Sequence, residues 1–180
     1  MDPSARKPLM KSVKVCILGD FAVGKTSLVR RFVDEAFSER YLTTVGVKID
    51  TKTVHLNDSG PIKLVLWDVA GADELSALQT SYVRGSAGFI LVCDLTRRET
   101  LTTATKLKSE VAAQFGPVPW CLLANKSDLA QEREIDDMAL TELAEDGWNV
   151  HATSAKTGFN VETAILALAS RLAAASGRSP

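Results

Sequence analysis

Eight residues near the N-terminus, Gly19 to Thr26, form the pattern G-x-x-x-x-G-K-T. A largely apolar run at residues 14–18 precedes the pattern, and residues 27–32 follow it with the apolar spacing of a helix. A strand, a glycine-rich loop and a helix in this order bring the backbone N–H groups of the loop and the helix N-terminus to one point, where they favour anions. The sequence therefore predicts a loop that cradles the phosphates of a nucleotide.

Side chains of the loop add to this prediction. Lys25 supplies a positive charge for the outer phosphates, and the hydroxyl of Thr26 is a ligand suited to Mg²⁺. The residues expected to contact the nucleotide here are Ala22, Val23, Gly24, Lys25, Thr26 and Ser27.

The composition is that of an ordinary soluble domain. The chain has 180 residues, a net charge of −1, 24% charged residues and 46% apolar residues. Such a length favours one domain, and the lack of a basic excess argues against a nucleic-acid partner. The three cysteines lie in apolar runs without metal or disulfide spacing, which is typical of a reducing compartment. We expect a cytoplasmic monomer.

The two ends of the sequence predict no membrane attachment. Residues 1–11 are expected to be flexible and lack the apolar core of a signal peptide, residues 12–174 form the domain, and residues 175–180 form a short tail. No cysteine lies near the C-terminus, so no intrinsic lipid anchor is expected. Either the natural tail is missing or the protein works without one.

Apolar runs alternate with helical patterns along the chain. Five of them are predicted strands, at residues 14–18, 63–67, 88–93, 120–124 and 149–153. Nearly unbroken apolar runs are typical of parallel strands covered on both faces. Residues 45–56 lead through a turn at 57–61 directly into the next strand, which predicts an antiparallel edge strand. We therefore predict an α/β fold with a six-stranded, mostly parallel sheet, one antiparallel edge strand and helices on both faces.

Polar motifs follow three of these strands, so they should meet the phosphate loop at the carboxyl edge of the sheet. Asp68 and Gly71 come after the strand at 63–67, and Asp68 is placed to hold the hydration shell of Mg²⁺. Asn125-Lys126-Ser-Asp128 follows the strand at 120–124, and Ser154-Ala155-Lys156 follows the strand at 149–153.

These last two motifs predict the base. The carboxylate of Asp128 can accept the N1–H and the exocyclic amine of guanine, whereas adenine would present a lone pair to it. The backbone N–H of Ala155 would donate to the guanine O6. Asn125 would tie this loop to the phosphate loop, while the stem of Lys126 packs along the ring. The predicted ligand is therefore guanine nucleotide, GTP or GDP, with Mg²⁺.

With these motifs the chain resembles the Ras-like small GTPases, and the Rab branch most closely, over nearly its whole length. The matching segments are residues 19–27, 41–47, 67–71, 82–88, 125–128 and 154–156. The resemblance implies a P-loop G domain that binds GTP or GDP with Mg²⁺, hydrolyses GTP slowly and recruits effector and regulatory proteins in the GTP state.

Further residues take their roles from the resemblance alone. Thr44 is similar to the threonine that reaches Mg²⁺ and the γ-phosphate, Phe37 to the aromatic residue that stacks on guanine, and Tyr41 belongs to the same nucleotide-contacting segment. Residues 37–48 and 71–84 correspond to the two switches. Effectors would meet a hydrophobic surface, although simple packing explains its residues equally well: Ile49, Trp67 and Tyr82.

Alanine at position 72 is the main departure from the family, which has a glutamine there to orient the attacking water. Catalysis is then left to Lys25, Thr44 and Gly71. Loss of one positioning contact is expected to slow turnover roughly ten- to a hundredfold. Either Ala72 is a brake that leaves a GTP-binding module with negligible hydrolysis, or a partner or another residue supplies the missing group.

A second departure lies inside the phosphate loop, where Phe21 and Ala22 replace smaller residues of the relatives. A phenyl ring at position 21 would crowd an incoming arginine finger, which predicts a poor response to activators that donate one. Alternatively, Phe21 folds over the nucleotide edge or packs on the second switch.

Overall fold

The structure is a computed structural model that describes residues 10–40, 42–57 and 59–176. Its elements follow one another as β1 (Lys11–Gly19), α1 (Lys25–Asp34), β2 (Val47–Leu56), β3 (Gly60–Val69), α2 (Ala77–Val83), β4 (Gly88–Asp94), α3 (Arg98–Phe115), β5 (Trp120–Asn125), a 3₁₀ turn (Ala130–Glu132), α4 (Asp137–Glu145), β6 (Val150–Ala152) and α5 (Val161–Ser176).

The strands form one sheet in the order β2-β3-β1-β4-β5-β6. β2 and β3 pair antiparallel, and every other pair is parallel, so the predicted six-stranded sheet with one antiparallel edge is confirmed. Some ends differ from the apolar runs. β1 begins at Lys11 because its ladder with β3 continues outward to Ile62, and β6 keeps only three residues, which pair with β5.

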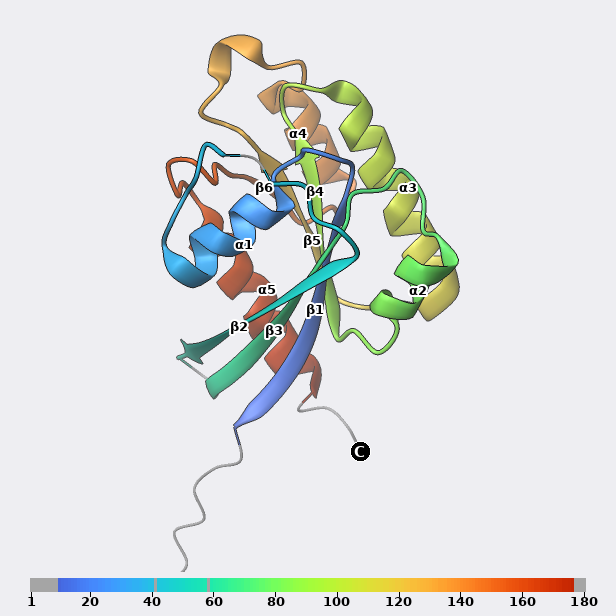
Figure 1. The fold of residues 1–180 in the computed structure, drawn as a ribbon, viewed down its shortest axis with the longest axis vertical. Coiled ribbons are helices and arrows are strands. Elements are labelled where there is room, and N and C mark those ends of the chain that lie inside the picture. The colour runs from blue at the N-terminus through green and yellow to red at the C-terminus, as the bar shows by residue number, and fades with distance from the viewer. Residues whose placement is uncertain (1–9, 41, 58, 177–180) are drawn as a thin grey trace, which may run out of the picture.

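Helices cover both faces of the sheet, and each face has its own apolar core (Figure 1). α1 and α5 enclose one core, which contains Phe32, Leu64 and Ile165. α2, α3 and α4 cover the other, which contains Leu91, Leu107 and Leu122. All seven residues of β4 are buried, because this central strand is covered on both faces, and its sequence is apolar up to the closing Asp94.

Buried residues recur at helical spacing on α3 and α5. On α3, Ala104, Leu107 and Val111 are buried, and four residues of α5 at three- and four-residue spacing face the core: Val161, Ile165, Leu168 and Leu172. Within the described residues, none of the helices has the length and apolar character needed to cross a membrane.

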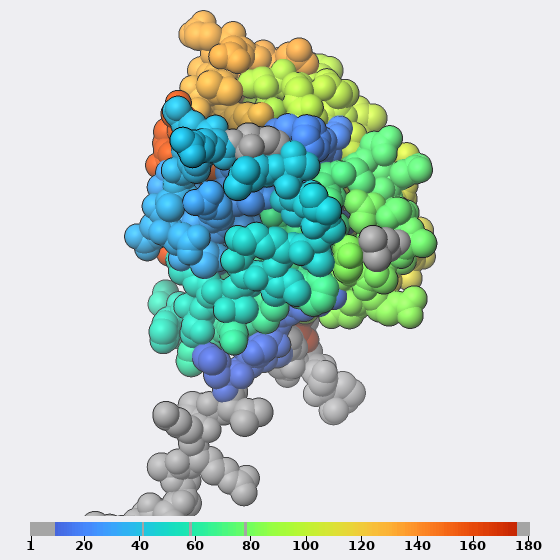
Figure 2. All heavy atoms as spheres, viewed as in Figure 1, coloured from blue at the N-terminus to red at the C-terminus, as the bar shows by residue number. Residues whose placement is uncertain are grey.

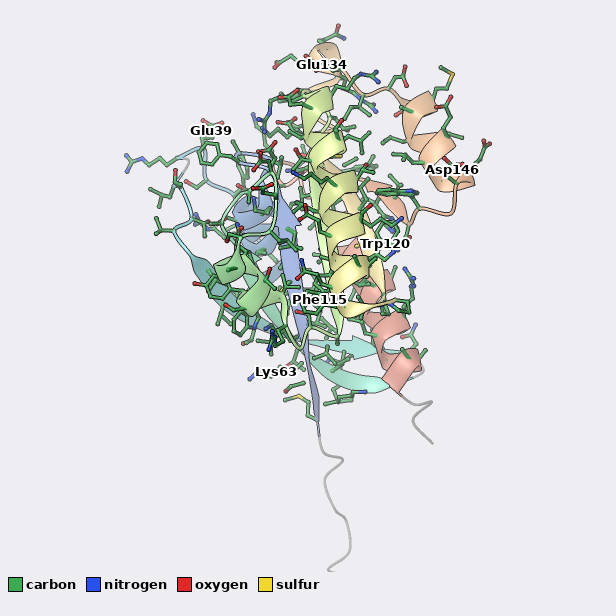
Figure 3. All side chains as sticks on the ribbon, turned by 90° about the vertical axis from the view of Figure 1, so that its right-hand side faces the viewer. Glu39, Lys63, Phe115, Trp120, Glu134 and Asp146 are labelled. Carbon is green, nitrogen blue, oxygen red and sulfur yellow. The ribbon has the colours of Figure 1, made fainter. Side chains whose placement is uncertain are left out.

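The five parallel strands end at one edge of the sheet, and their loops gather there. In Figure 3, Glu39 and Glu134 lie at this upper edge, whereas Lys63, near the start of β3, lies at the opposite end. The loop after β1 and the loops after β3, β4, β5 and β6 are therefore neighbours, although they are distant in sequence.

Candidate nucleotide-binding site

The candidate site is built around the loop that joins β1 to α1. Gly24 precedes α1 with φ of 100°, a left-handed conformation that suits glycine, and a Cβ there would lie 2.3 Å from Nδ2 of Asn125. The Nζ of Lys25 donates hydrogen bonds to the carbonyls of Gly19, at 3.1 Å, and Asp20, at 2.8 Å. The lysine thus spans the loop from within, and its charge lies beside the N-terminus of α1.

Lys25 is a buried cation. Burial lowers its pKa to about 8, although the carboxylates of Asp68 and Asp20 act in the opposite direction. A phosphate group next to Nζ would replace the lost hydration and favour the charged form. The loop is therefore built for an anion.

Three oxygen-bearing side chains meet beside Lys25. The hydroxyl of Thr26 lies 2.7 Å from that of Thr44 and donates to Oδ2 of Asp68, and Thr44 Oγ1 lies 3.4 Å from the same carboxylate oxygen. The three residues come from α1, the segment before β2, and β3, so the structure brings together all the predicted metal ligands.

Asp68 carries the strongest indication of a cation. Burial raises its pKa above the ordinary value, against the hydrogen bond from Thr26 and the charge of Lys25, which lower it. Its Oδ1 is buried and has no hydrogen-bond partner among the described residues. Among the described residues, no group of three His, Cys, Asp or Glu side chains could hold a metal ion. The donors here are instead one carboxylate and two hydroxyls. Such an all-oxygen set fits Mg²⁺, which takes few protein ligands beside water and phosphate.

Gly71 packs directly against the phosphate loop. A Cβ at this position would lie 2.6 Å from Cα of Phe21, so only glycine allows the close approach. The next residue, Ala72, donates its N–H to the carbonyl of Gly19 at 3.2 Å. The backbone of Ala72 therefore lies next to the loop, and its methyl side chain offers no polar group. Phe21 itself is 49% exposed.

The base-side motifs meet through Asn125, which is almost fully buried at the end of β5. Its Nδ2 donates to the carbonyl of Val23 at 3.0 Å, and its Oδ1 accepts the N–H of Ala155 at 3.1 Å. The predicted tie between Asn125 and the phosphate loop is thus present. The N–H of Ala155, which we predicted to face guanine O6, is bonded to Asn125 in this structure.

A cavity of about 280 Å³ opens beside these loops. Asp128 lies in its wall, and Oδ1 of this carboxylate accepts a hydrogen bond from the hydroxyl of Ser154 at 2.6 Å. Phe37, 36% exposed, lines the same cavity. The remaining lining residues are Ala22, Gly24, Ser27, Ser38, Glu39, Asn125, Lys126, Leu129, Ala155 and Lys156. Most of the predicted base-side residues therefore share one cavity. Ser154 does not line it but is bonded to Asp128, and Tyr41 lies outside the described residues.

Two further residues of this edge were not predicted. The carboxylate of Asp94, at the end of β4, accepts Nζ of Lys126 at 2.6 Å and Nε of Arg97 at 3.2 Å. Burial raises the pKa of Asp94, but the hydrogen bonds from Lys126 and Thr96 outweigh it and leave the pKa below the ordinary value. Arg97 also donates to the carbonyl of Phe21 at 2.7 Å. The position of Asp94 was visible in the sequence, since it closes an apolar strand as Asn125 does.

The three predicted effector-binding residues lie together outside the nucleotide site. Ile49 on β2 pairs with Trp67 on β3, and the ring of Trp67 lies 6.4 Å from that of Tyr82. Ile49 is 50% exposed. The segment from residue 42 into β2 crosses the front of the molecule between α1 and α2 (Figure 2, cyan). The three side chains can therefore form one surface beside both switches.

Comparison with known proteins agrees with this geometry. The family model described as the Ras family matches residues 14–174. The chain belongs to the Ras family of small GTPases. Among its relatives, Ras-related protein Rab-10 of Caenorhabditis elegans is 34% identical over 94% of this chain and 85% of its own. Ras-related protein Rab-22A of Canis lupus familiaris is 34% identical over 95% and 89%. Ras-related protein Rab-7L1 of Rattus norvegicus is 35% identical over 88% and 81%. The chain is thus a Ras-family GTP-binding switch, with Rab proteins among its relatives.

Replacement of Asn125 by alanine is expected to release nucleotide. The substitution removes two buried hydrogen bonds and leaves the Val23 carbonyl and the Ala155 N–H unpaired. A loss of about 2–3 kcal/mol corresponds to GDP dissociating roughly 30- to 150-fold faster. Stopped-flow dissociation of a fluorescent GDP measures this rate. Asn149→Ala, at the far end of β6, is the matched control and should leave the rate unchanged; equal rates for the two variants would contradict the bridging role.

The pKa of Lys25 predicts how nucleotide affinity varies with pH. Because the free protein holds this pKa at about 8, the lysine loses its proton above that pH and nucleotide binding must then take up a proton. GDP affinity should therefore fall between about pH 8 and pH 9, by up to roughly tenfold per pH unit. The nucleotide-free protein should instead gain stability as the pH rises through this range, because a buried charge disappears.

Calorimetric titration of GDP in buffers of different ionisation enthalpy measures both the affinity and the proton uptake. An affinity that stays constant from about pH 7 to about pH 9, without proton uptake, would show that Lys25 remains charged in the free protein.

Proposed function

We propose that this Ras-family protein binds GTP and GDP with Mg²⁺ and hydrolyses GTP slowly. The observation that carries the proposal is the convergence of Lys25, Thr26, Thr44 and Asp68 on one side of the site and of Asn125 and Asp128 on the other. The two groups are joined by the side chain of Asn125. A ligand with phosphates at one end and a guanine base at the other satisfies both.

Guanine is favoured by the hydrogen-bonding groups of the cavity. Asp128 offers a carboxylate, which only accepts hydrogen bonds, and guanine presents two donors to it. Adenine would place the N1 lone pair against the carboxylate. The hydroxyl of Ser154 occupies one oxygen of Asp128 and holds the carboxylate in one orientation, which supports a fixed contact with the base.

Hydrolysis would proceed by in-line attack of water on the γ-phosphate. Lys25 and the backbone N–H groups of the loop stabilise the charge that develops on the phosphate oxygens. Mg²⁺, held by Thr26, Thr44 and Asp68, would neutralise charge between the outer phosphates. Gly71 brings its backbone N–H close to the same phosphate, because it packs against the loop without a Cβ.

Ala72 supports slow turnover. The N–H of Ala72 is bonded to the carbonyl of Gly19, which brings the backbone of this residue beside the phosphate loop. Its methyl side chain cannot orient a water molecule by hydrogen bonding. The second candidate function, a GTP-binding interaction module with negligible hydrolysis, rests on this same residue.

Partners would recognise the surface formed by Ile49, Trp67 and Tyr82. We propose that effectors bind this surface when Thr44 and Gly71 contact the γ-phosphate. These two residues lie in the segments before β2 and after β3, which are on either side of the surface. Phe21 projects with about half of its surface exposed at the phosphate loop. Its exposure supports the prediction that an activator inserting an arginine finger is hindered.

Restoring a glutamine at position 72 is expected to accelerate hydrolysis. A recovered positioning contact of about 1–3 kcal/mol corresponds to roughly ten- to a hundredfold faster single-turnover GTP hydrolysis in Ala72→Gln. Ala72→Met is the matched control, because methionine has a similar length and no amide. Comparable, readily measured rates in the natural protein and Ala72→Gln would end the brake hypothesis. A rate in the natural protein indistinguishable from uncatalysed hydrolysis would favour the binding module.

Guanine selectivity has a separate test. Unlabelled GTP should displace fluorescent GDP from the protein, whereas ATP at the same concentration should displace little. Adenine would place its N1 lone pair against the Asp128 carboxylate and lose the two hydrogen bonds that guanine donates, which costs several kcal/mol, roughly a thousandfold in affinity. Equilibrium displacement titrations measure both affinities. Effective displacement by ATP would overturn the role proposed for Asp128.

A further inference from the structure

Arg31, in the last turn of α1, binds the backbone of the loop that follows β6. Its Nε donates to the carbonyl of Ala155 at 2.8 Å, and its Nη2 donates to the carbonyl of Lys156 at 2.5 Å. A third donor, Nη1, reaches the carbonyl of Glu35 at 3.1 Å, just beyond the end of α1. One guanidinium therefore holds three carbonyls from two segments that are more than a hundred residues apart in sequence.

The Arg31 side chain packs closely against the loop after β6. Its stem passes Gly158, where a Cβ would lie 3.5 Å from Cδ of Arg31. In Figure 1 the loop after β6 lies beside α1, as these bonds require. The arginine fork donates from separate nitrogens in fixed directions within one plane, so it can bind neighbouring carbonyls simultaneously, whereas the three donors of a lysine ammonium all radiate from one nitrogen.

A cap for α1 explains only part of this arrangement. A basic side chain in the last turn favours the helix dipole, and the bond to Glu35 is of this kind. The other two bonds go to Ala155 and Lys156, which contribute nothing to α1. They fix the outer side of a loop whose inner side is held by Asn125 through the N–H of Ala155.

We propose that Arg31 is a positioning residue for guanine recognition. By holding the carbonyls of Ala155 and Lys156, it fixes the backbone of a loop whose residues line the base cavity, so that a backbone N–H of this loop can donate to O6. Because α1 begins at Lys25 in the phosphate loop and ends beside Arg31, the helix connects the phosphate end of the site to the base end. This inference rests on the proposed function, since it assumes that the cavity holds guanine.

The experiment compares GDP with 6-thio-GDP, in which sulfur, a weak acceptor, replaces O6 while the groups facing Asp128 remain. Arg31→Ala should weaken GDP binding on the order of tenfold and 6-thio-GDP binding much less, so the preference for GDP should shrink. Arg30→Ala is the matched control, because Arg30 carries the same charge on the same helix and makes no such carbonyl bonds within the described part of the chain. Its preference should equal that of the natural protein.

Arg31→Lys provides the second variant and keeps the charge and most of the stem. It should also lose most of the preference, because the ammonium lacks the separate coplanar donors, Nε and Nη2, that reach the two carbonyls in fixed directions. Thermal unfolding shows that each variant is folded before its affinities are compared.

Each outcome bears on one claim. Equal weakening of GDP and 6-thio-GDP in Arg31→Ala would overturn the positioning role, because general loosening of α1 lowers both affinities alike. An unchanged preference in Arg31→Ala, or the same loss in Arg30→Ala, would overturn it as well. If the natural protein itself shows no preference for GDP over 6-thio-GDP, the contact with guanine O6 that the sequence predicts fails instead.

Discussion

The side-chain amide of Asn125 is the contact on which the site depends. It lies at the buried end of β5 and uses its donor on the phosphate loop and its acceptor on the loop after β6. An amide is an uncharged group that offers both a donor and an acceptor in a fixed plane. Without this side chain, the phosphate loop and the loop after β6 would lose the hydrogen bonds that join them through Asn125. Asn125 therefore links the phosphate loop directly to the loop after β6, while Arg31 links the latter to α1.

Buried charge at this edge is tolerated because opposite charges and hydrogen bonds accompany it. Lys25 lies near Asp68 and Asp20, and Asp94 is paired with Lys126 and Arg97. The pairing is complete at Asp94, whose pKa stays below its ordinary value, and incomplete at Asp68, whose pKa is raised. The Mg²⁺ proposed above would complete the pairing at Asp68. The same difference separates a structural carboxylate from one that is ready to bind a metal.

The chain carries most of the side chains that resemble the family's nucleotide-binding residues, but it lacks a glutamine at the position of the family's water-orienting residue. The phosphate loop, the oxygen-bearing side chains and the base-side motifs all lie at one edge of the sheet. Position 72, whose backbone N–H is bonded to the loop, carries only a methyl group. Binding uses many backbone and side-chain contacts whose contributions are spread over the site. Orientation of a single water depends on one or two contacts, so one substitution affects turnover far more than affinity.

The sequence by itself determined the fold class, the phosphate loop and the residues at the strand ends, because these signals are local. Unbroken apolar runs mark covered parallel strands, and glycine and lysine spacing marks the loop. It could also have indicated Asp94, which ends its strand as Asn125 does. Only the tertiary structure decided the roles of Arg31 and Arg97. Both donate to backbone carbonyls distant in the chain, 124 residues away for Arg31 and 76 for Arg97. A bond to a backbone carbonyl leaves no trace in the partner's residue type, so no sequence pattern could have predicted it.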